Sequence, residues 1–209
     1  MVARRRSGRI GAMSTRWQNT EAPRGDDYDA RWRSLAASGQ SVHGEADLVE
    51  AILGESGGTR VLDAGCGTGR VAIELSARGF SVVGVDADPG MLTTARAKSP
   101  ELPWIDADLA DLPESVGAGF DLALLAGNVM IFLQPGTEAA VVTAIGERLV
   151  PGGLLVSGFS IRPDRLSLKR YDELTQRVGL EPVARWATWN REPFTGGDYA
   201  VSVHRRLEP

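Results

Sequence analysis

Residues 60–75, RVLDAGCGTGRVAIEL, decide the fold of this 209-residue chain. A short apolar run, RVLDA, leads into three closely spaced glycines, and an amphipathic segment of helical length follows them. Glycine is a poor residue for ending a strand or starting a helix, unless the backbone must turn sharply or approach a ligand closely. The stretch therefore predicts a strand, a loop that is either a tight turn or a ligand site, and a helix.

The same alternation of short apolar runs and helix-length segments continues along the chain. Strands are predicted at residues 60–64, 81–87, 103–107, 120–127 and 152–160, and helices at 70–78, 91–97, 137–149 and 168–178. Two further helices, at 28–37 and 45–53, precede the first strand. Strands that alternate with helices form right-handed βαβ units. The predicted fold is α/β, Rossmann-like and doubly wound, with a mostly parallel sheet.

The C-terminal part of the chain breaks this alternation. VARWATWN at 183–190 and DYAVSVHRR at 198–206 both alternate in polarity, and the segment between them has no room for a crossover helix. We therefore expect an antiparallel hairpin at one edge of the sheet.

Length and composition predict one soluble domain. Residues 1–16 are predicted to be a disordered basic tail, with Met13 an alternative start to Met1, and residues 17–209 a single domain whose helical lead-in covers 17–57. The net charge of -4 disfavours a nucleic-acid partner. A single cysteine and the lack of a long apolar run favour a cytoplasmic protein without a membrane span.

The glycine-rich loop carries a specific chemical signal. Its spacing is G-x-G-x-G, and Arg70 stands where a dinucleotide-binding loop has its third glycine, so an NAD site is disfavoured. Asp63, just before the loop, would repel a pyrophosphate and attract an ammonium or sulfonium group. Asp86 ends the second predicted strand about 20 residues after the loop, where a carboxylate accepts hydrogen bonds from ribose hydroxyls.

More acidic residues follow the second and third predicted strands. Asp88 precedes Pro89 and is interpreted as a helix N-cap outside the site. At the end of the third strand, either Asp106 or Asp108 could accept from an adenine amino group while Leu109 packs on the ring, although acids at strand ends also serve simply as solvated loop residues.

Five segments taken in order resemble the class I S-adenosylmethionine-dependent methyltransferases: VLDAGCGTGR, VVGVDADPGML, IDADLADLP, FDLALLAGNVMIFL and PGGLLVSGF. The resemblance extends from residue 44 to the C-terminus, and the C-terminal part is similar to small bacterial methyltransferases. It implies a seven-stranded sheet whose last strand is antiparallel, S-adenosylmethionine as cofactor and S-adenosylhomocysteine as product. The cofactor-binding residues that it implies are Asp63 at the methionine ammonium, Gly65 and Gly67 in the loop, Asp86 at the ribose with Ala87 next to it in the chain, Asp108 and Leu109 at the adenine, and Asn128 near the methionine part and the acceptor.

The methyl acceptor is expected to be a small molecule, because the marker motifs of DNA methyltransferases are missing. No Asp/Asn set suggests a catechol-type Mg²⁺ site, so no metal is expected. Methyl transfer mainly requires alignment of the acceptor, and a general base is optional. His43, Glu45 and Asn128 are the catalytic candidates, and Tyr28, Arg31 and Trp32 either line the acceptor pocket or pack the lead-in. Two alternatives remain: a non-catalytic S-adenosylmethionine-binding protein, and an NAD-dependent oxidoreductase.

Overall fold

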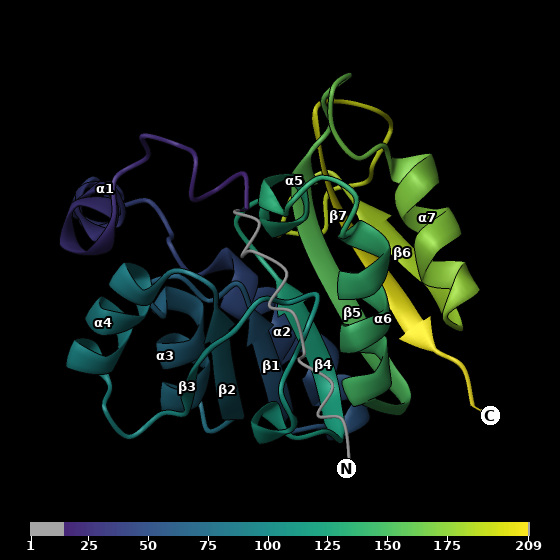
Figure 1. Ribbon diagram of the computed structural model, residues 1–209, viewed down its shortest axis with the longest axis horizontal. Helices are drawn as coiled ribbons and strands as arrows, with labels where there is room; N and C mark the ends of the chain where they lie inside the picture. The colour runs from purple at the N-terminus through teal and green to yellow at the C-terminus, as the bar shows by residue number, and fades with distance from the viewer. Residues whose placement is uncertain (1–14, 209) are drawn as a thin grey trace, which may run out of the picture.

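A seven-stranded sheet in the order β3-β2-β1-β4-β5-β7-β6 runs through the computed structural model, which describes residues 15–208 (Figure 1). Its strands are β1 Arg60–Ala64, β2 Ser81–Asp86, β3 Trp104–Asp106, β4 Phe120–Leu125, β5 Leu149–Ser160, β6 Leu180–Trp186 and β7 Tyr199–Arg206. The predicted strands and the Rossmann-like α/β class are confirmed. Of the predicted basic tail, residues 1–14 lie outside the described residues.

The predicted C-terminal hairpin is present, because β6 and β7 pair antiparallel. β7 also pairs antiparallel with β5, so β7 lies inside the sheet and β6 forms the edge. β6 begins at Leu180, three residues before the predicted start, and ends at Trp186 instead of residue 190. Leu180 is fully buried, whereas the backbone after Trp186 turns: the Ala187 N–H donates to Glu192 O and Arg191 has φ +62°. Burial of Leu180 and the turn after Trp186 explain why β6 starts and ends earlier than predicted.

Helices cover both faces of the sheet (Figure 1). They are α1 Gly25–Ala37, α2 Gly44–Ser56, α3 Arg70–Ala77, α4 Pro89–Lys98, α5 Val129–Phe132, α6 Glu138–Arg148 and α7 Leu168–Arg177, with a 3₁₀ turn η1 at Glu114–Val116. The sequence analysis missed α5 and η1, because elements of one turn are too short to show a helical period. No helix among residues 15–208 has the length and apolar character needed to cross a membrane.

Successive side chains of each strand point to opposite faces of the sheet, so a hydrophobic core forms on each face. Val61 packs with the residues of α2, α3 and α4 on one face of the sheet, and its neighbour Leu62 packs with α6 and α7 on the other. His204 on β7 is fully buried, and its Nε2 lies 3.2 Å from Asp172 Oδ1 on α7. Burial lowers the pKa of His204, which fits a structural role for this neutral side chain.

The strand order reverses between β1 and β4, which lie next to each other although β2 and β3 separate them in the chain. In open α/β sheets the ligand crevice forms at such a point, beyond the carboxyl ends of the strands. α1 stands at this end of the molecule, apart from the helices that cover the sheet, and packs against α4 (Figure 1). The fold thus places the glycine-rich loop, the β4–α5 loop and the lead-in around one crevice.

Candidate active site

A cavity lies at the reversal point of the sheet, and we call it the first cavity. It brings together seven of the eight residues predicted to bind cofactor: Asp63, Gly65, Gly67, Asp86, Ala87, Asp108 and Leu109. The lead-in contributes Trp17 and Tyr28 to its wall, and the segment after β4 contributes Gly127, Val129 and Phe132. Trp17 and Phe132 were not predicted from the sequence, because the position of Trp17 depends on how the lead-in folds back and Phe132 lies in the one-turn helix α5.

The glycine-rich loop needs its small residues for two different reasons. Gly65 lies against α5, since a Cβ at this position would come within 2.5 Å of Val129 Cγ2. Gly67 has φ +55°, and its N–H donates to Asp86 Oδ2 at 2.8 Å. Between them, Cys66 is buried and burial raises the pKa of its thiol, in keeping with a packing role. The loop is therefore both a tight turn and a wall of the cavity.

Asp63 is the most unusual side chain of the first cavity. It is 2% exposed, and its Oδ2 has no hydrogen-bond partner among the described residues. Burial raises the pKa of Asp63 to about 7, with Asp86 and Glu45 adding to the rise and Arg70 opposing it. A buried carboxylate oxygen without a partner is costly, and a cationic group of a ligand would remove that cost.

Asp86 holds the loops around the cavity together. Its Oδ2 accepts from the Gly67 N–H and its Oδ1 accepts from the Asp88 N–H, both at 2.8 Å. Burial raises the pKa of this carboxyl group. Each carboxylate oxygen retains further lone-pair capacity, so Asp86 can organise the loop and also receive ribose hydroxyls. In the loop after β3, Asp108 Oδ1 accepts from the Ala110 N–H at 2.9 Å.

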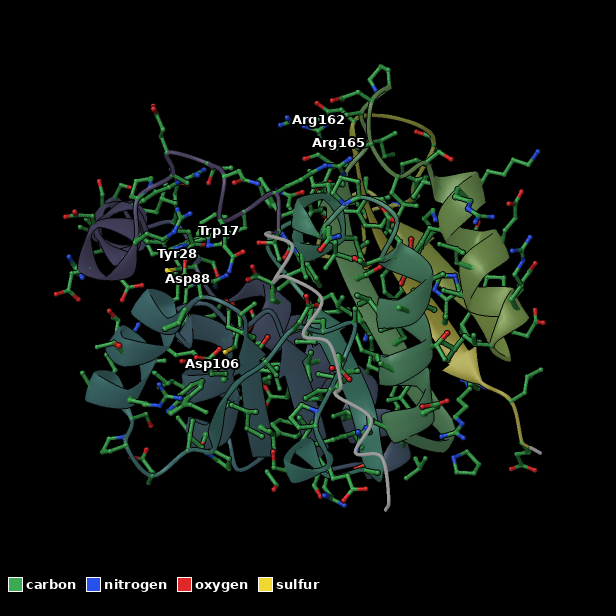
Figure 2. All side chains as sticks on the ribbon, in the orientation of Figure 1. Trp17, Tyr28, Asp88, Asp106, Arg162 and Arg165 are labelled. Carbon is green, nitrogen blue, oxygen red and sulfur yellow. The ribbon has the colours of Figure 1, made fainter. Side chains whose placement is uncertain are left out.

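The lead-in is fastened over the first cavity at Asp88. The predicted N-cap role of Asp88 is confirmed, because its Oδ1 accepts from the N–H groups of Gly90 and Met91. Its Oδ2 accepts from Trp17 Nε1 at 3.0 Å and from Arg24 Nε at 2.8 Å. Figure 2 shows Trp17, Tyr28 and Asp88 close together above the sheet. One carboxylate thus caps α4 and anchors the start of the lead-in.

A second fastening joins α1 directly to the glycine-rich loop. Asp29 on α1 is buried, and its Oδ1 accepts from Thr68 Oγ1 at 2.5 Å. Its Oδ2 pairs with Lys98 Nζ on α4 at 2.6 Å. Because Thr68 lines the first cavity, Asp29 links α1 and α4 to the cavity wall.

We expect Asp29→Asn to release the lead-in. The neutral amide of asparagine cannot form an ion pair with the Lys98 ammonium. Loss of a charge-assisted hydrogen bond of this kind costs about 1.5–3 kcal/mol. Amide hydrogen exchange in α1 should accelerate by about 10- to 100-fold, while exchange in β1 and β4 stays unchanged. Asp26→Asn, an exposed change in the first turn of α1, is the control and should have no effect. Equal exchange rates in both variants would contradict the assignment.

A second cavity adjoins the first and shares Trp17, Tyr28, Gly127 and Phe132 with it. Its volume is about 600 Å³, within the range of small-molecule pockets. Tyr28, Arg31 and Trp32 line it. Trp189 and Tyr199 come from the C-terminal hairpin and its connection, and the sequence analysis missed them. The aromatic residues clustered near that predicted hairpin were the available signal.

The three catalytic candidates occupy different environments. Glu45 lines the second cavity, but Arg70 Nη2 and Nη1 bind its two carboxylate oxygens at 2.5 and 3.0 Å. Asn128 also lines the second cavity and not the first. His43 lines neither cavity; its Nδ1 lies 3.4 Å from Glu74 Oε2. The structure therefore brings Glu45 and Asn128 to the site, with Glu45 already paired, and leaves His43 outside it.

The first cavity suits a ligand with excess positive charge. It contains the carboxylates of Asp63, Asp86 and Asp108, and the guanidinium of Arg70 is shared with Glu45. S-adenosylmethionine carries a sulfonium, an ammonium and one carboxylate, so its net charge is positive. The Oδ2 of Asp63, which has no partner among the described residues, and the left-handed backbone of Gly67 fit this cofactor.

Comparison with known proteins agrees with this geometry. A family model described as a methyltransferase domain matches residues 61–153. A solved structure of a TehB-like S-adenosylmethionine-dependent methyltransferase from Corynebacterium glutamicum is 35% identical, with a TM-score of 0.77 over 87% of this chain and 97% of that one. This chain belongs to the class I S-adenosylmethionine-dependent methyltransferases. S-adenosylmethionine is accordingly the cofactor of this methyltransferase, and the NAD-dependent oxidoreductase alternative is set aside.

Curated relatives of this methyltransferase act on different acceptors. The magnesium-protoporphyrin O-methyltransferase of Rhodobacter capsulatus is 30% identical over 116 residues, covering 52% of this chain and 51% of that protein. The glycine N-methyltransferase of Rattus norvegicus is 36% identical over 124 residues, covering 50% and 41%. The alignments thus span about half of each relative. The names of these relatives include both O- and N-methylation, so the acceptor has to be sought in this chain's own site.

Proposed function

We propose that this methyltransferase transfers a methyl group from S-adenosylmethionine to a small molecule bound in the second cavity. The contact between the two cavities carries this proposal, since Trp17, Tyr28, Gly127 and Phe132 belong to the walls of both. A methyl donor in the first cavity would therefore lie next to an acceptor in the second. A cavity of about 600 Å³ suits a small molecule better than a nucleic acid, which would need a basic surface.

The residues of the first cavity would bind and orient the cofactor, which supplies an electrophilic methyl group when it is bound. Asp63 would pair with the methionine ammonium, and Asp86 with Ala87 would hold the ribose. Asp108 and Leu109 would contact the adenine. Transfer at an activated sulfonium depends chiefly on alignment and on exclusion of water.

The lead-in would help to exclude water from the reacting groups. Trp17 packs edge-to-face on Phe132, with ring centroids 5.6 Å apart, and Arg24 stacks on the Trp17 ring at 4.0 Å. Asp29 and Asp88 hold this layer against the cavity through the bonds described above. The lead-in would thus cover both reactants at the position where they meet.

Calorimetric titration with S-adenosylmethionine, S-adenosylhomocysteine and NADH in parallel tests the proposal. We expect the first two to bind with micromolar affinity and NADH not to bind. Labelled methyl transfer to a panel of small acceptors then separates an enzyme from a non-catalytic binding protein. Binding of NADH alone would overturn the proposal, and cofactor binding without transfer to any acceptor would favour the non-catalytic alternative.

A further inference from the structure

We propose that the second cavity takes an aromatic acceptor through an anionic oxygen, a phenolate or an aryl carboxylate, and that this oxygen receives the methyl group. The inference rests on the proposed function and names its substrate class. The aromatic wall of the cavity selects the ring, and the hydrogen-bonding groups left free in that wall select the oxygen.

Aromatic side chains from three parts of the chain line the second cavity. The lead-in, α5 and the C-terminal hairpin with its connection contribute Trp17, Tyr28, Trp32, Phe132, Trp189 and Tyr199. Planar ligands gain from stacked and edge-to-face contacts with such walls. The cavity therefore suits a flat ring better than a branched or flexible aliphatic acceptor.

Asn128 presents a hydrogen-bond donor to this cavity. Its Oδ1 accepts from the Ser160 N–H at 2.7 Å, and because a backbone N–H can pair only with the amide oxygen, the orientation of the side chain is fixed. Nδ2 is then the free end, and it has no partner within residues 15–208. The backbone is fixed as well, with φ +70° and the Asn128 N–H bound to Gly158 O at 3.2 Å.

Tyr199 presents a second donor at the same part of the cavity. Its hydroxyl oxygen accepts from Trp189 Nε1 at 3.1 Å, which leaves the hydroxyl hydrogen free to donate. A Cβ on Gly158 would lie 2.5 Å from this oxygen, so Tyr199 and Asn128 both lie against Gly158 of β5. Burial raises the pKa of Tyr199 to about 12, and the hydroxyl stays protonated at neutral pH.

The carboxylates near the cavity are poorly placed for an amine. An ammonium group offers only donors and needs acceptors, but Arg70 occupies both oxygens of Glu45. Asp27 is exposed on α1, and Arg31 follows it one turn later. Asn128 and Tyr199 are half-buried beside Gly158, and each keeps a donor free, which favours an anionic oxygen.

The transfer step itself does not require a free base. The anionic oxygen forms the new O–C bond as the S–C bond breaks, and the electron pair of that bond stays on sulfur. The sulfonium becomes a neutral thioether, and no proton is released because the acceptor enters as an anion. A phenolate or carboxylate therefore needs no general base, whereas an ammonium would have to lose a proton first.

Equilibrium binding of matched probes tests the inference without relying on turnover. Calorimetry at pH 8, with the enzyme saturated by S-adenosylhomocysteine, compares 4-nitrophenolate, benzoate and the benzylammonium ion. We expect at least one of the two anions to bind about tenfold or more tightly than the cation. Labelled methyl transfer then shows which oxygen is used, because the phenolate yields an ether and the carboxylate an ester.

Two substitutions sharpen the test. Asn128→Asp keeps the oxygen that accepts from Ser160 but replaces the free donor by a negative charge. It should weaken anion binding by about 30-fold and strengthen benzylammonium binding, and Tyr199→Phe should weaken anion binding by about 5- to 10-fold. Gln40→Glu, which adds a charge at an exposed position between α1 and α2, is the control and should change neither affinity by more than about twofold.

The outcomes separate this inference from the proposed function. Failure to bind S-adenosylhomocysteine would contradict the proposed function itself. If S-adenosylhomocysteine binds but benzylammonium binds more tightly than both anions, or if neither class of probe binds, the anionic-oxygen inference is wrong. It is also wrong if Asn128→Asp leaves the preference between anion and cation unchanged.

Discussion

Asp63→Asn is expected to stabilise the protein in the absence of cofactor and to remove most of its affinity for S-adenosylmethionine. In the native protein burial raises the pKa of Asp63 to about 7 from its ordinary value of 3.8, so the folded state binds a proton that the unfolded state has lost over this pH range. The free energy of unfolding therefore falls as pH rises from about 4 to 7, by up to about 4 kcal/mol. Asparagine does not ionise and escapes this loss.

The variant should consequently melt up to about 10 °C above the wild-type protein at pH 8, and the difference should vanish near pH 4. Differential scanning calorimetry without ligand measures both values. Asp106→Asn is the matched control, because Asp106 is exposed at the end of β3 and lines neither cavity (Figure 2). Its melting temperature should follow that of the wild-type protein at every pH.

The effect of Asp63→Asn on cofactor binding has the opposite sign. Loss of a buried, charge-assisted contact to the methionine ammonium should weaken S-adenosylmethionine binding by about 100-fold at pH 8. In the wild-type protein the affinity should rise about tenfold from pH 6 to pH 8, as Asp63 gives up its proton, and this rise should be absent in the variant. If the variant bound cofactor as tightly as the wild type, Asp63 would not contact the ammonium.

Asp86→Ala is expected to cause the second large loss of cofactor affinity, about 100-fold or more for S-adenosylhomocysteine. The structure shows that this carboxylate also holds the Gly67 and Asp88 N–H groups, so loss of affinity alone does not prove a ribose contact. Circular dichroism and the melting temperature establish whether the variant remains folded.

A ligand change separates the two roles of Asp86. The wild-type protein should bind the 2′-deoxy analogue of S-adenosylhomocysteine about tenfold more weakly than S-adenosylhomocysteine itself, because a hydrogen bond to the carboxylate is missing. In Asp86→Ala this discrimination should fall below about threefold, since the partner of the hydroxyl is gone. A variant that discriminates as strongly as the wild type would show that Asp86 acts only by ordering the loop.

The class of the fold and the clustering of carboxylates around the glycine-rich loop could be predicted from the sequence alone. Apolar runs that alternate with amphipathic segments require a parallel sheet covered by helices, and the carboxyl ends of parallel strands meet at one edge. Asp63 lies near the end of β1, Gly67 lies in the loop after β1, and Asp86 ends β2, so their proximity follows from the order of the elements. A local sequence pattern is therefore sufficient to predict where such residues lie.

Which side chains are still free to bind a ligand depends on contacts between elements that are distant in the chain. Glu45 could be chosen as a candidate base from the sequence, but its pairing with Arg70 depends on how α2 packs against α3. Asn128 likewise keeps a free donor because β5 brings Ser160 to its oxygen. Hydrogen bonds between residues 25 or 32 positions apart leave no local sequence pattern, since each depends on the packing of separate elements.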